Sequence, residues 1–137
     1  MSAPQSEVLQ VELIPTDGED TNNGSIALVT INRPNKLNAL NSDVMDSIKN
    51  MCKWVEAENS VRCVVITGAK PLPPVEGKRA KPNAFVAGAD ITEFVGKNSK
   101  DIKIQFTDNG VEAIWSLSKP TIAMVDGFAL GGGCEVA

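Results

Sequence analysis

Histidine and tyrosine are both absent from this 137-residue sequence. The lack of histidine excludes the most common general base from these residues, together with every Ser-His or Cys-His nucleophile pair. Acid–base chemistry here must therefore use a carboxylate, a lysine or a cysteine.

Cysteine is scarce, with only Cys52, Cys63 and Cys134. Three widely spaced cysteines favour neither a disulfide framework nor a cysteine zinc site. We therefore expect a reducing compartment and no metal ion.

Long apolar runs and excess positive charge are also missing. No run approaches the roughly 20 residues of a membrane span, and the first 24 residues contain no Lys or Arg. We therefore expect an intracellular protein without a secretory signal, and mitochondrial matrix, peroxisome-type organelle and cytoplasm stay open. The net charge of -4 argues against nucleic-acid binding, which needs a basic face.

What is present predicts a globular α/β domain, since 42% of the residues are hydrophobic. Residues 8–14 and 25–31 predict a β-hairpin, and a helix capped by Asn41 or Ser42 leads to a strand at residues 63–68, buried on both faces. A basic, proline-rich loop follows at residues 70–83. We then expect a strand ending near Gly88, a helix over residues 100–117, a strand at 121–125 and a helix starting near Gly133.

Two apolar strands end in small-residue turns, "AGAD" at residues 87–90 and "ALGGGCE" at residues 129–135. If both strands lie in one parallel sheet, both turns lie at its carboxyl edge, where such sheets bind ligands. The backbone N–H groups of Ala89 and Gly132 are candidates for an oxyanion hole. Glu135, in the first turn of the following helix, is the candidate acid or base.

Simpler interpretations of these residues stay open. A glycine-rich turn is often only a tight connection or a phosphate cradle, and Glu135 and Asp90 are in positions typical of helix caps. "GGGCE" lacks the Lys-Ser/Thr ending of a P-loop, and neither turn has the full dinucleotide fingerprint.

Three segments, "NRPNKLNAL" (32–40), "FVAGADITEF" (85–94) and "KPTIAMVDGFALGGGCE" (119–135), resemble signature segments of the crotonase, or enoyl-CoA hydratase/isomerase, superfamily. The sequences of "GADITEF" and "GGGCE" within these segments are most similar to the hydratase region of multifunctional fatty-acid β-oxidation enzymes. The resemblance implies a crotonase-like spiral of ββα repeats, truncated before the C-terminal helical region. Residues 1–137 are then the N-terminal part of one domain, with residues 1–24 as an acidic lead and hairpin start.

The resemblance also implies a lyase that adds water to 2-enoyl-CoA thioesters. It implies that Ala89 and Gly132 bind the thioester oxygen and that Glu135 is catalytic, with a second glutamate beyond Ala137. The remaining residues implied at the acyl-CoA site are Lys36, Leu37, Ala87, Asp90, Ile91, Thr92 and Gly131. No cofactor is implied apart from the coenzyme A of the substrate, and the assembly expected is a homotrimer or hexamer.

Two alternative functions stay open at this point. One is an enoyl-CoA isomerase or another thioester-enolate reaction on the same fold, and the other is a non-catalytic acyl-CoA-binding fragment or truncated subunit. The loop at residues 70–83 is either a solvated insertion or a site that attracts CoA phosphates.

Overall fold

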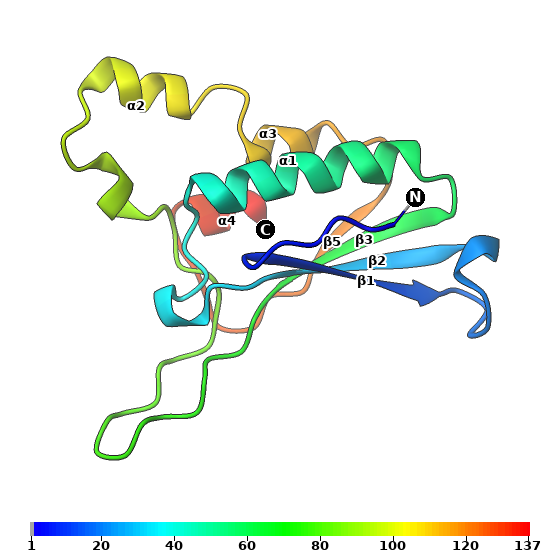
Figure 1. The fold of residues 1–137 in the computed structure, drawn as a ribbon, viewed down its shortest axis with the longest axis horizontal. Coiled ribbons are helices and arrows are strands. Elements are labelled where there is room, and N and C mark those ends of the chain that lie inside the picture. Colours follow the sequence, from blue (N-terminus) through cyan, green and yellow to red (C-terminus); the bar gives the residue numbers. More distant parts are fainter. Residues whose placement is uncertain (1) are drawn as a thin grey trace.

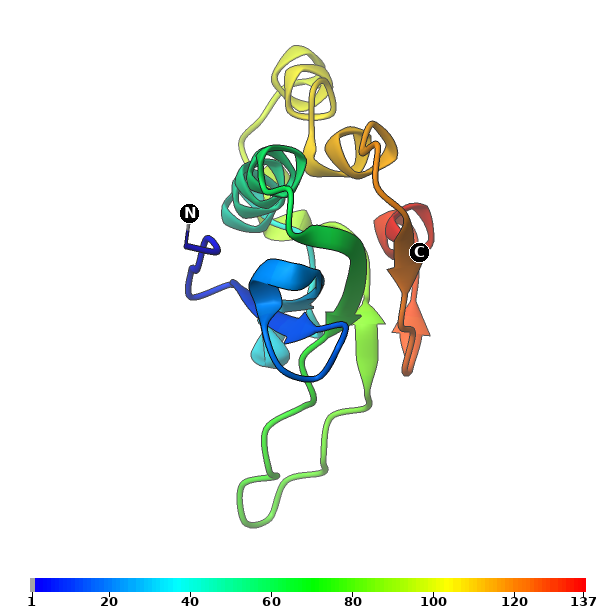
Figure 2. The same ribbon diagram turned by 90° about the vertical axis from the view of Figure 1, so that its right-hand side faces the viewer.

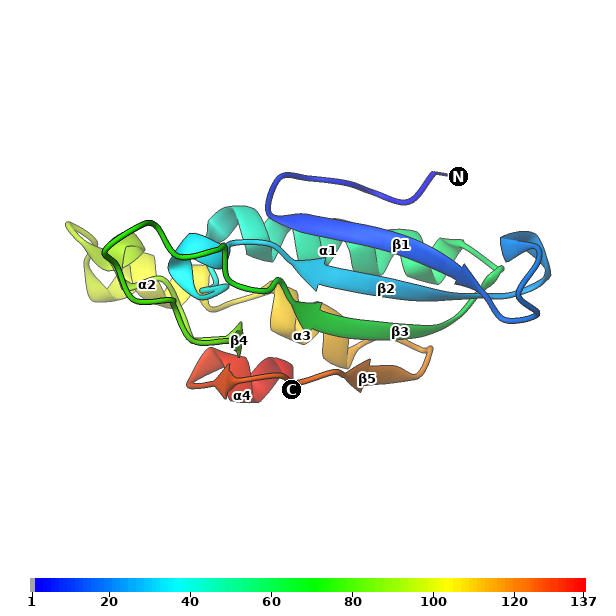
Figure 3. The ribbon, with the colours of Figure 1, turned by 90° about the horizontal axis from the view of Figure 1, so that it is seen from below.

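A computed structural model describes residues 2–137. The main sheet has the strand order β1 (Leu9–Pro15), β2 (Ser25–Ile31), β3 (Val61–Gly68) and β5 (Thr121–Ala123). β1 is antiparallel to β2, whereas β2, β3 and β5 run parallel (Figure 3). The predicted hairpin is therefore confirmed, with a short 3-10 helix η1 (Thr21–Asn23) in its connection.

Helix α1 (Ser42–Ala57) connects β2 to β3 and lies along the sheet (Figure 1). Of the two caps considered, Asn41 is the N-cap, because its side chain accepts a hydrogen bond from the Val44 N–H at 2.9 Å. Burial raises the pKa of the Cys52 thiol to about 12, so this residue stays protonated and packs as a small apolar side chain. The predicted amphipathic helix and the βαβ unit are confirmed.

The hydrophobic core lies between the sheet and the helices α1 and α3, which are on the same side of it (Figure 2). Apolar positions at helical spacing on α1 and at alternating spacing on the strands supply it. Its strand and helix members include Leu9, Val11, Ala27, Val29, Ile31, Val44, Ile48, Met51, Val55, Val61, Val64, Ile66, Val111 and Ile114.

Strand β3 differs from the expectation of burial on both faces. Val61, Val64 and Ile66 are buried under the helices, but Cys63, Val65 and Thr67 on the opposite face are only half-buried. Figure 3 looks onto that opposite face, where the strands lie in front of α1. Within residues 2–137 the helices cover only one face of the sheet.

The single helix expected over residues 100–117 is wrong. The structure has α2 (Ser99–Gln105) and α3 (Gly110–Trp115) instead. Asp108 has a left-handed backbone with φ of 51°, and the side chain of Asn109 caps α3. A left-handed residue cannot continue a right-handed helix, so the chain turns between the two segments.

A second, two-stranded parallel sheet pairs β4 (Ala84–Val86) with β6 (Phe128–Ala129). The strand expected at residues 121–125 is shorter, and as β5 it pairs with β3 rather than with β4. The two glycine-containing turns nevertheless share one edge, since they follow β4 and β6. After them come the 3-10 helix η3 (Ile91–Phe94) and helix α4 (Gly132–Val136).

The predicted basic loop runs from the end of β3 to the start of β4, away from the helices (Figures 1 and 2). Two of its lysines are paired, Lys70 with the Asp126 carboxylate and Lys81 with the Asn35 carbonyl. The second contact places the loop beside the 3-10 helix η2 (Pro34–Lys36). No helix in residues 2–137 has the length and apolar character needed to cross a bilayer.

Candidate active site

The turns after β4 and β6 lie backbone to backbone. The Leu130 N–H donates to the Val86 carbonyl at 3.1 Å, and a Cβ placed on Gly88 would lie 3.3 Å from the Leu130 carbonyl oxygen. The structure therefore brings together the two turns that the sequence analysis singled out.

The backbone of Leu40 fixes the direction of the Ala89 amide. The Leu40 N–H donates to the Gly88 carbonyl at 2.8 Å, and the Asp90 N–H donates to the Leu40 carbonyl at 2.8 Å. In a trans peptide the N–H points opposite to the C=O, so the Ala89 N–H is directed away from Leu40.

Gly132 lies close to Ala89, since a Cβ placed on Gly132 would be 3.9 Å from the Ala89 nitrogen. Within residues 2–137, neither the Ala89 N–H nor the Gly132 N–H has a hydrogen-bond acceptor. Two unpaired backbone donors close together are the arrangement that binds a carbonyl oxygen acquiring negative charge.

Helix α4 packs directly on β4 because residue 133 is glycine. A Cβ at Gly133 would overlap the carbonyl oxygen of Val86, and Gly133 is buried. Gly131, with φ of 52°, begins the helix, and Val136 anchors it at 6% exposure. This packing places Glu135 in the first turn of α4, where its side chain is exposed and has no hydrogen bond or ion pair with any residue from 2 to 137.

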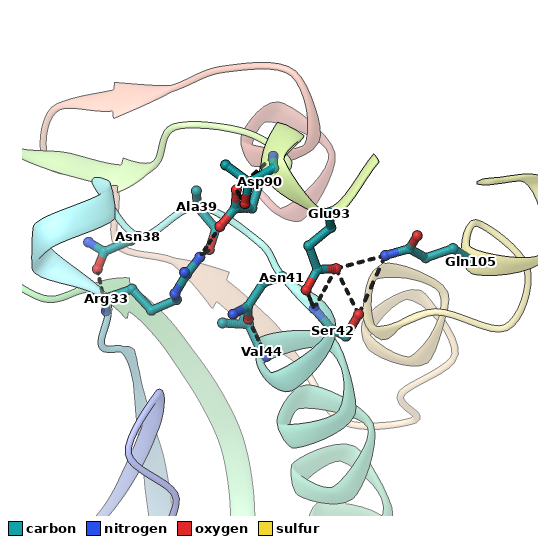
Figure 4. Close-up of polar contacts among 10 residues, drawn as sticks. Arg33, Asn38, Ala39, Asn41, Ser42, Val44, Asp90, Glu93 and Gln105 are labelled. Carbon is teal, nitrogen blue, oxygen red and sulfur yellow. Dashed lines mark hydrogen bonds and ion pairs between the residues drawn. The ribbon is translucent and has the colours of Figure 1, made fainter. Parts of the chain in front are cut away.

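Asp90 and Thr92 bind each other at the start of η3. Asp90 Oδ1 accepts from the Thr92 hydroxyl at 2.6 Å. Asp90 Oδ2 accepts from Arg33 Nη1 at 3.0 Å (Figure 4). The hydroxyl of Thr92 and then the Arg33 guanidinium outweigh partial burial and hold the pKa of the Asp90 carboxyl below its ordinary value. The intervening Ile91 is 75% exposed, so of these three expected site residues it has the freest side chain.

The segment between η2 and Leu40 contacts the first turn through backbone atoms. The Ala87 N–H donates to the Leu37 carbonyl at 3.1 Å, which joins two of the expected site residues. Lys36 ends η2 with an exposed side chain, and Leu37 follows in a left-handed conformation with φ of 52°.

Asn38 is a structural residue of the site that sequence reasoning did not single out. It is 1% exposed, its amide nitrogen donates to the carbonyls of Ala69 and Ala84, and its oxygen accepts from the Arg33 N–H. Its φ of 56° is a conformation that asparagine tolerates better than most residues. The closely spaced asparagines of "NRPNKLN" were the available signal, because asparagine favours such turns.

Glu93 connects η3 to the start of α1 and to α2. Its carboxylate accepts from the Ser42 N–H and hydroxyl and from the Gln105 amide (Figure 4). Partial burial alone would raise the pKa of the Glu93 carboxyl. The hydrogen bonds from Ser42 and Gln105 outweigh this effect, so the pKa lies below its ordinary value. No sequence signal connects these three residues.

A narrow pocket lies beside Ala89 with a cavity volume of about 30 Å³. The apolar side chains of Met45 from α1, of Phe94 from η3 and of Phe106, which follows α2, line much of it. The ring centroids of Phe94 and Phe106 lie 6.0 Å apart. Its lining residues are Leu40, Asn41, Met45, Ala89, Asp90, Glu93, Phe94, Gln105 and Phe106. No group of three or more potential metal ligands occurs in the described part of the chain.

Comparisons with known proteins identify the family of this chain. Residues 21–137 match the family model for enoyl-CoA hydratase/isomerase. The chain is 43% identical over 116 residues to a short-chain-enoyl-CoA hydratase of Clostridium acetobutylicum, an alignment that covers 83% of this chain and 40% of that protein. The chain thus spans about 40% of the length of this relative.

Solved structures of similar fold include an enoyl-CoA hydratase/carnithine racemase from Magnetospirillum magneticum. The TM-score is 0.74 at 27% identity, covering 97% of this chain and 44% of that one. A monofunctional enoyl-CoA isomerase from M. smegmatis matches with a TM-score of 0.59 at 25% identity, over 96% of this chain and 46% of that one. With the family match over residues 21–137, these likenesses confirm the crotonase-type fold, and the chain belongs to the enoyl-CoA hydratase/isomerase family.

Proposed function

We propose that this protein binds 2-enoyl-CoA thioesters and adds water across their 2,3 double bond, as in fatty-acid β-oxidation. The observation that carries the proposal is the pair of unpaired N–H groups at Ala89 and Gly132 on facing turns. The 43% identical relative, named a short-chain-enoyl-CoA hydratase, supports the same substrate class.

In the proposed reaction, the thioester oxygen accepts hydrogen bonds from Ala89 and Gly132. Glu135 accepts a proton from water, and the water oxygen forms a bond to C3. The electron pair of the double bond moves to give an enolate, whose negative oxygen the two N–H groups stabilise. A proton then adds to C2 and Glu135 gives up the proton that it took from water, so one water has been added in total, the carboxylate is restored and the product is a 3-hydroxyacyl-CoA.

The proposal also includes two features that the family resemblance implies. Coenzyme A enters as part of the substrate, with no other cofactor, and the protein assembles as a homotrimer or hexamer. Light scattering coupled to size-exclusion chromatography would measure the assembly, and a monomer would contradict that part of the proposal.

The role of Glu135 is tested by Glu135→Gln, with Glu76→Gln in the exposed loop between β3 and β4 as the matched control. Loss of the general base should lower the rate of crotonyl-CoA hydration by about 10²-fold or more. The measurement is the loss of enoyl-thioester absorbance, and the control should keep its rate. Near-normal turnover by Glu135→Gln would contradict the assignment.

A second candidate reaction is migration of the double bond in 3-enoyl-CoA, because one structural match is an enoyl-CoA isomerase. The same two N–H groups would stabilise the enolate formed when a base removes a proton from C2. A substrate panel in which hydration and double-bond migration are followed separately would distinguish the two reactions.

A further inference from the structure

We propose that Arg33 is a positioning residue that holds the Ala89 amide in the direction needed to bind a thioester oxygen. This inference rests on the proposed function and deepens it, because it assigns a role to a residue in the segment that precedes the catalytic turns.

One guanidinium nitrogen of Arg33 contacts both the segment before Leu40 and the turn after Ala89. Arg33 Nη1 donates to the carbonyl of Ala39 at 2.8 Å and to Asp90 Oδ2 at 3.0 Å (Figure 4). Ala39 immediately precedes Leu40, and Asp90 immediately follows Ala89. Arg33 therefore ties together the two segments whose backbones pair at Leu40 and Ala89.

That pairing sets the direction of the Ala89 N–H. Leu40 binds the peptide groups on both sides of Ala89, and the bond to the Gly88 carbonyl turns the Ala89 N–H to the opposite side. An isolated bridge has only these two backbone hydrogen bonds, whereas a strand has a ladder. Arg33 adds a side-chain connection between the same two segments, whose strand-like pairing is limited to the single bridge between Leu40 and Ala89.

Burial and charge give Arg33 a second effect on the same site. The side chains of Arg33 and Asp90 are only 15% and 10% exposed, so the pair is poorly screened by water. Without Arg33, the carboxylate of Asp90 would be left uncompensated one residue from the amide that is to bind an enolate oxygen. Its negative charge would oppose the charge that develops in the reaction.

The test combines kinetics with the infrared carbonyl stretch of a bound 2-enoyl-CoA that carries a ¹³C label at C1. Hydrogen bonds to a thioester oxygen weaken the C=O bond and lower its stretching frequency, so the downshift measures the alignment of the two N–H groups. The variants are Arg33→Gln and Arg33→Lys, with Arg62→Gln, at an exposed position of β3, as the matched control. Thermal melting of each variant establishes that it is folded.

For Arg33→Gln we expect the downshift to fall to half or less of its original size and kcat to fall by about 10- to 100-fold, with KM changed less than about threefold. Arg33→Lys should recover part of both, because it keeps a cation beside Asp90 without bridging two acceptors in fixed geometry. If Arg33→Gln does not fold, the same comparison is made with Arg33→Lys, for which an unchanged downshift and unchanged kcat would overturn the inference.

The double variant Arg33→Gln/Asp90→Asn separates geometry from charge. It removes the uncompensated carboxylate but does not restore the bridge, so a persistent loss of the downshift supports positioning. Full recovery of kcat and of the downshift would overturn positioning and leave charge compensation alone. A folded Arg33→Gln with an unchanged downshift overturns this inference only, whereas the absence of a downshift with the unmodified protein overturns the proposed function as well.

Discussion

The two turns of the candidate site are held in place in different ways. Side chains hold the backbone of the turn that carries Ala89, whereas close packing of backbone at a residue without a side chain holds the turn that carries Gly132. Asp90 accepts hydrogen bonds from Thr92 and Arg33, and both members of the Asp90–Arg33 ion pair are mostly buried. Gly133, by contrast, lies against the Val86 carbonyl with no room for a Cβ. One half of the site is thus fixed by hydrogen bonds and charge, and the other by close backbone packing.

The difference matters because the two kinds of support respond to different perturbations. A charged hydrogen-bond network weakens when a carboxylate is protonated or an arginine is replaced. A backbone contact across a glycine is insensitive to pH but does not tolerate one added methyl group. Each half of the candidate site can therefore be disturbed while the other half is left intact.

The largest effect is expected for Gly133→Ala. The added Cβ overlaps the Val86 carbonyl, so α4 must move and take the Gly132 N–H with it. We expect hydration to fall by about 10²- to 10³-fold, as for loss of one oxyanion donor. Overpacking should also lower the free energy of unfolding by about 1–3 kcal/mol.

The control for this prediction is Gly18→Ala, because Gly18 has a positive φ of 80° but open space around it, whereas Gly133 has no room for a Cβ. It should lower the free energy of unfolding by about 1–2 kcal/mol through backbone strain and leave the hydration rate unchanged. Urea unfolding and the hydration assay measure both. Full activity in Gly133→Ala would mean that the packing of α4 on β4 does not set the position of Gly132.

An intermediate effect is expected for Asn38→Ala, which removes the buried amide that joins the Arg33 N–H to the two ends of the loop between β3 and β4. Two buried carbonyls and the Arg33 N–H lose their partner, and alanine is strained at a φ of 56°. The free energy of unfolding should fall by about 3 kcal/mol, as measured by urea unfolding. Asn35→Ala, at an exposed neighbouring position, should change it by less than about 0.5 kcal/mol. Equal losses in the two variants would show that the hydrogen bonds of the buried amide do not stabilise the fold.

The smallest effect is a pH dependence confined to the hydrogen-bonded half of the site. The folded pKa of Asp90 lies below its ordinary value of 3.8, so the ionised carboxylate stabilises the fold above that value. This stabilisation is lost as the pH falls through the folded pKa. The difference in free energy of unfolding between the unmodified protein and Asp90→Asn should therefore be constant above about pH 5 and shrink below pH 3.8.

Urea unfolding between pH 2 and pH 6 would measure this difference. Glu93 titrates in both proteins, so its contribution largely cancels. A difference that stays constant down to the lowest pH would show that the Asp90 carboxylate is not stabilised by Thr92 and Arg33.

The sequence predicted the local elements better than their long-range pairing. The hairpin and α1 followed from periodicity and from the cap at Asn41, which are short-range signals. The prediction of one helix over residues 100–117 was wrong because "TDNG" at residues 107–110 is a typical turn sequence, which separates α2 from α3 although the apolar spacing continues across it. The pairing of β5 with β3 depends on packing between distant segments, which periodicity does not encode.

At the site, the sequence pointed to the two turns but not to what supports them. Small residues after apolar strands indicated Ala89 and Gly132, because such turns leave backbone N–H groups accessible. Arg33 and Asp90 are 57 positions apart, and Asn38 contacts Ala84 across 46 positions. Contacts of this kind are not visible in residue type or spacing, since they arise only when the segments have folded together.

The two carbonyls bound by the amide of Asn38 belong to Ala69 and Ala84, which are the two ends of the loop between β3 and β4. One buried side chain therefore closes this loop, whatever the chain does in between. Because the entropy of closing a loop grows slowly, by about 0.6 kcal/mol for each doubling of its length, segments of very different size can be accommodated there. The fold thus has a position at which evolution can lengthen, shorten or recharge the chain beside the candidate site without rebuilding the core.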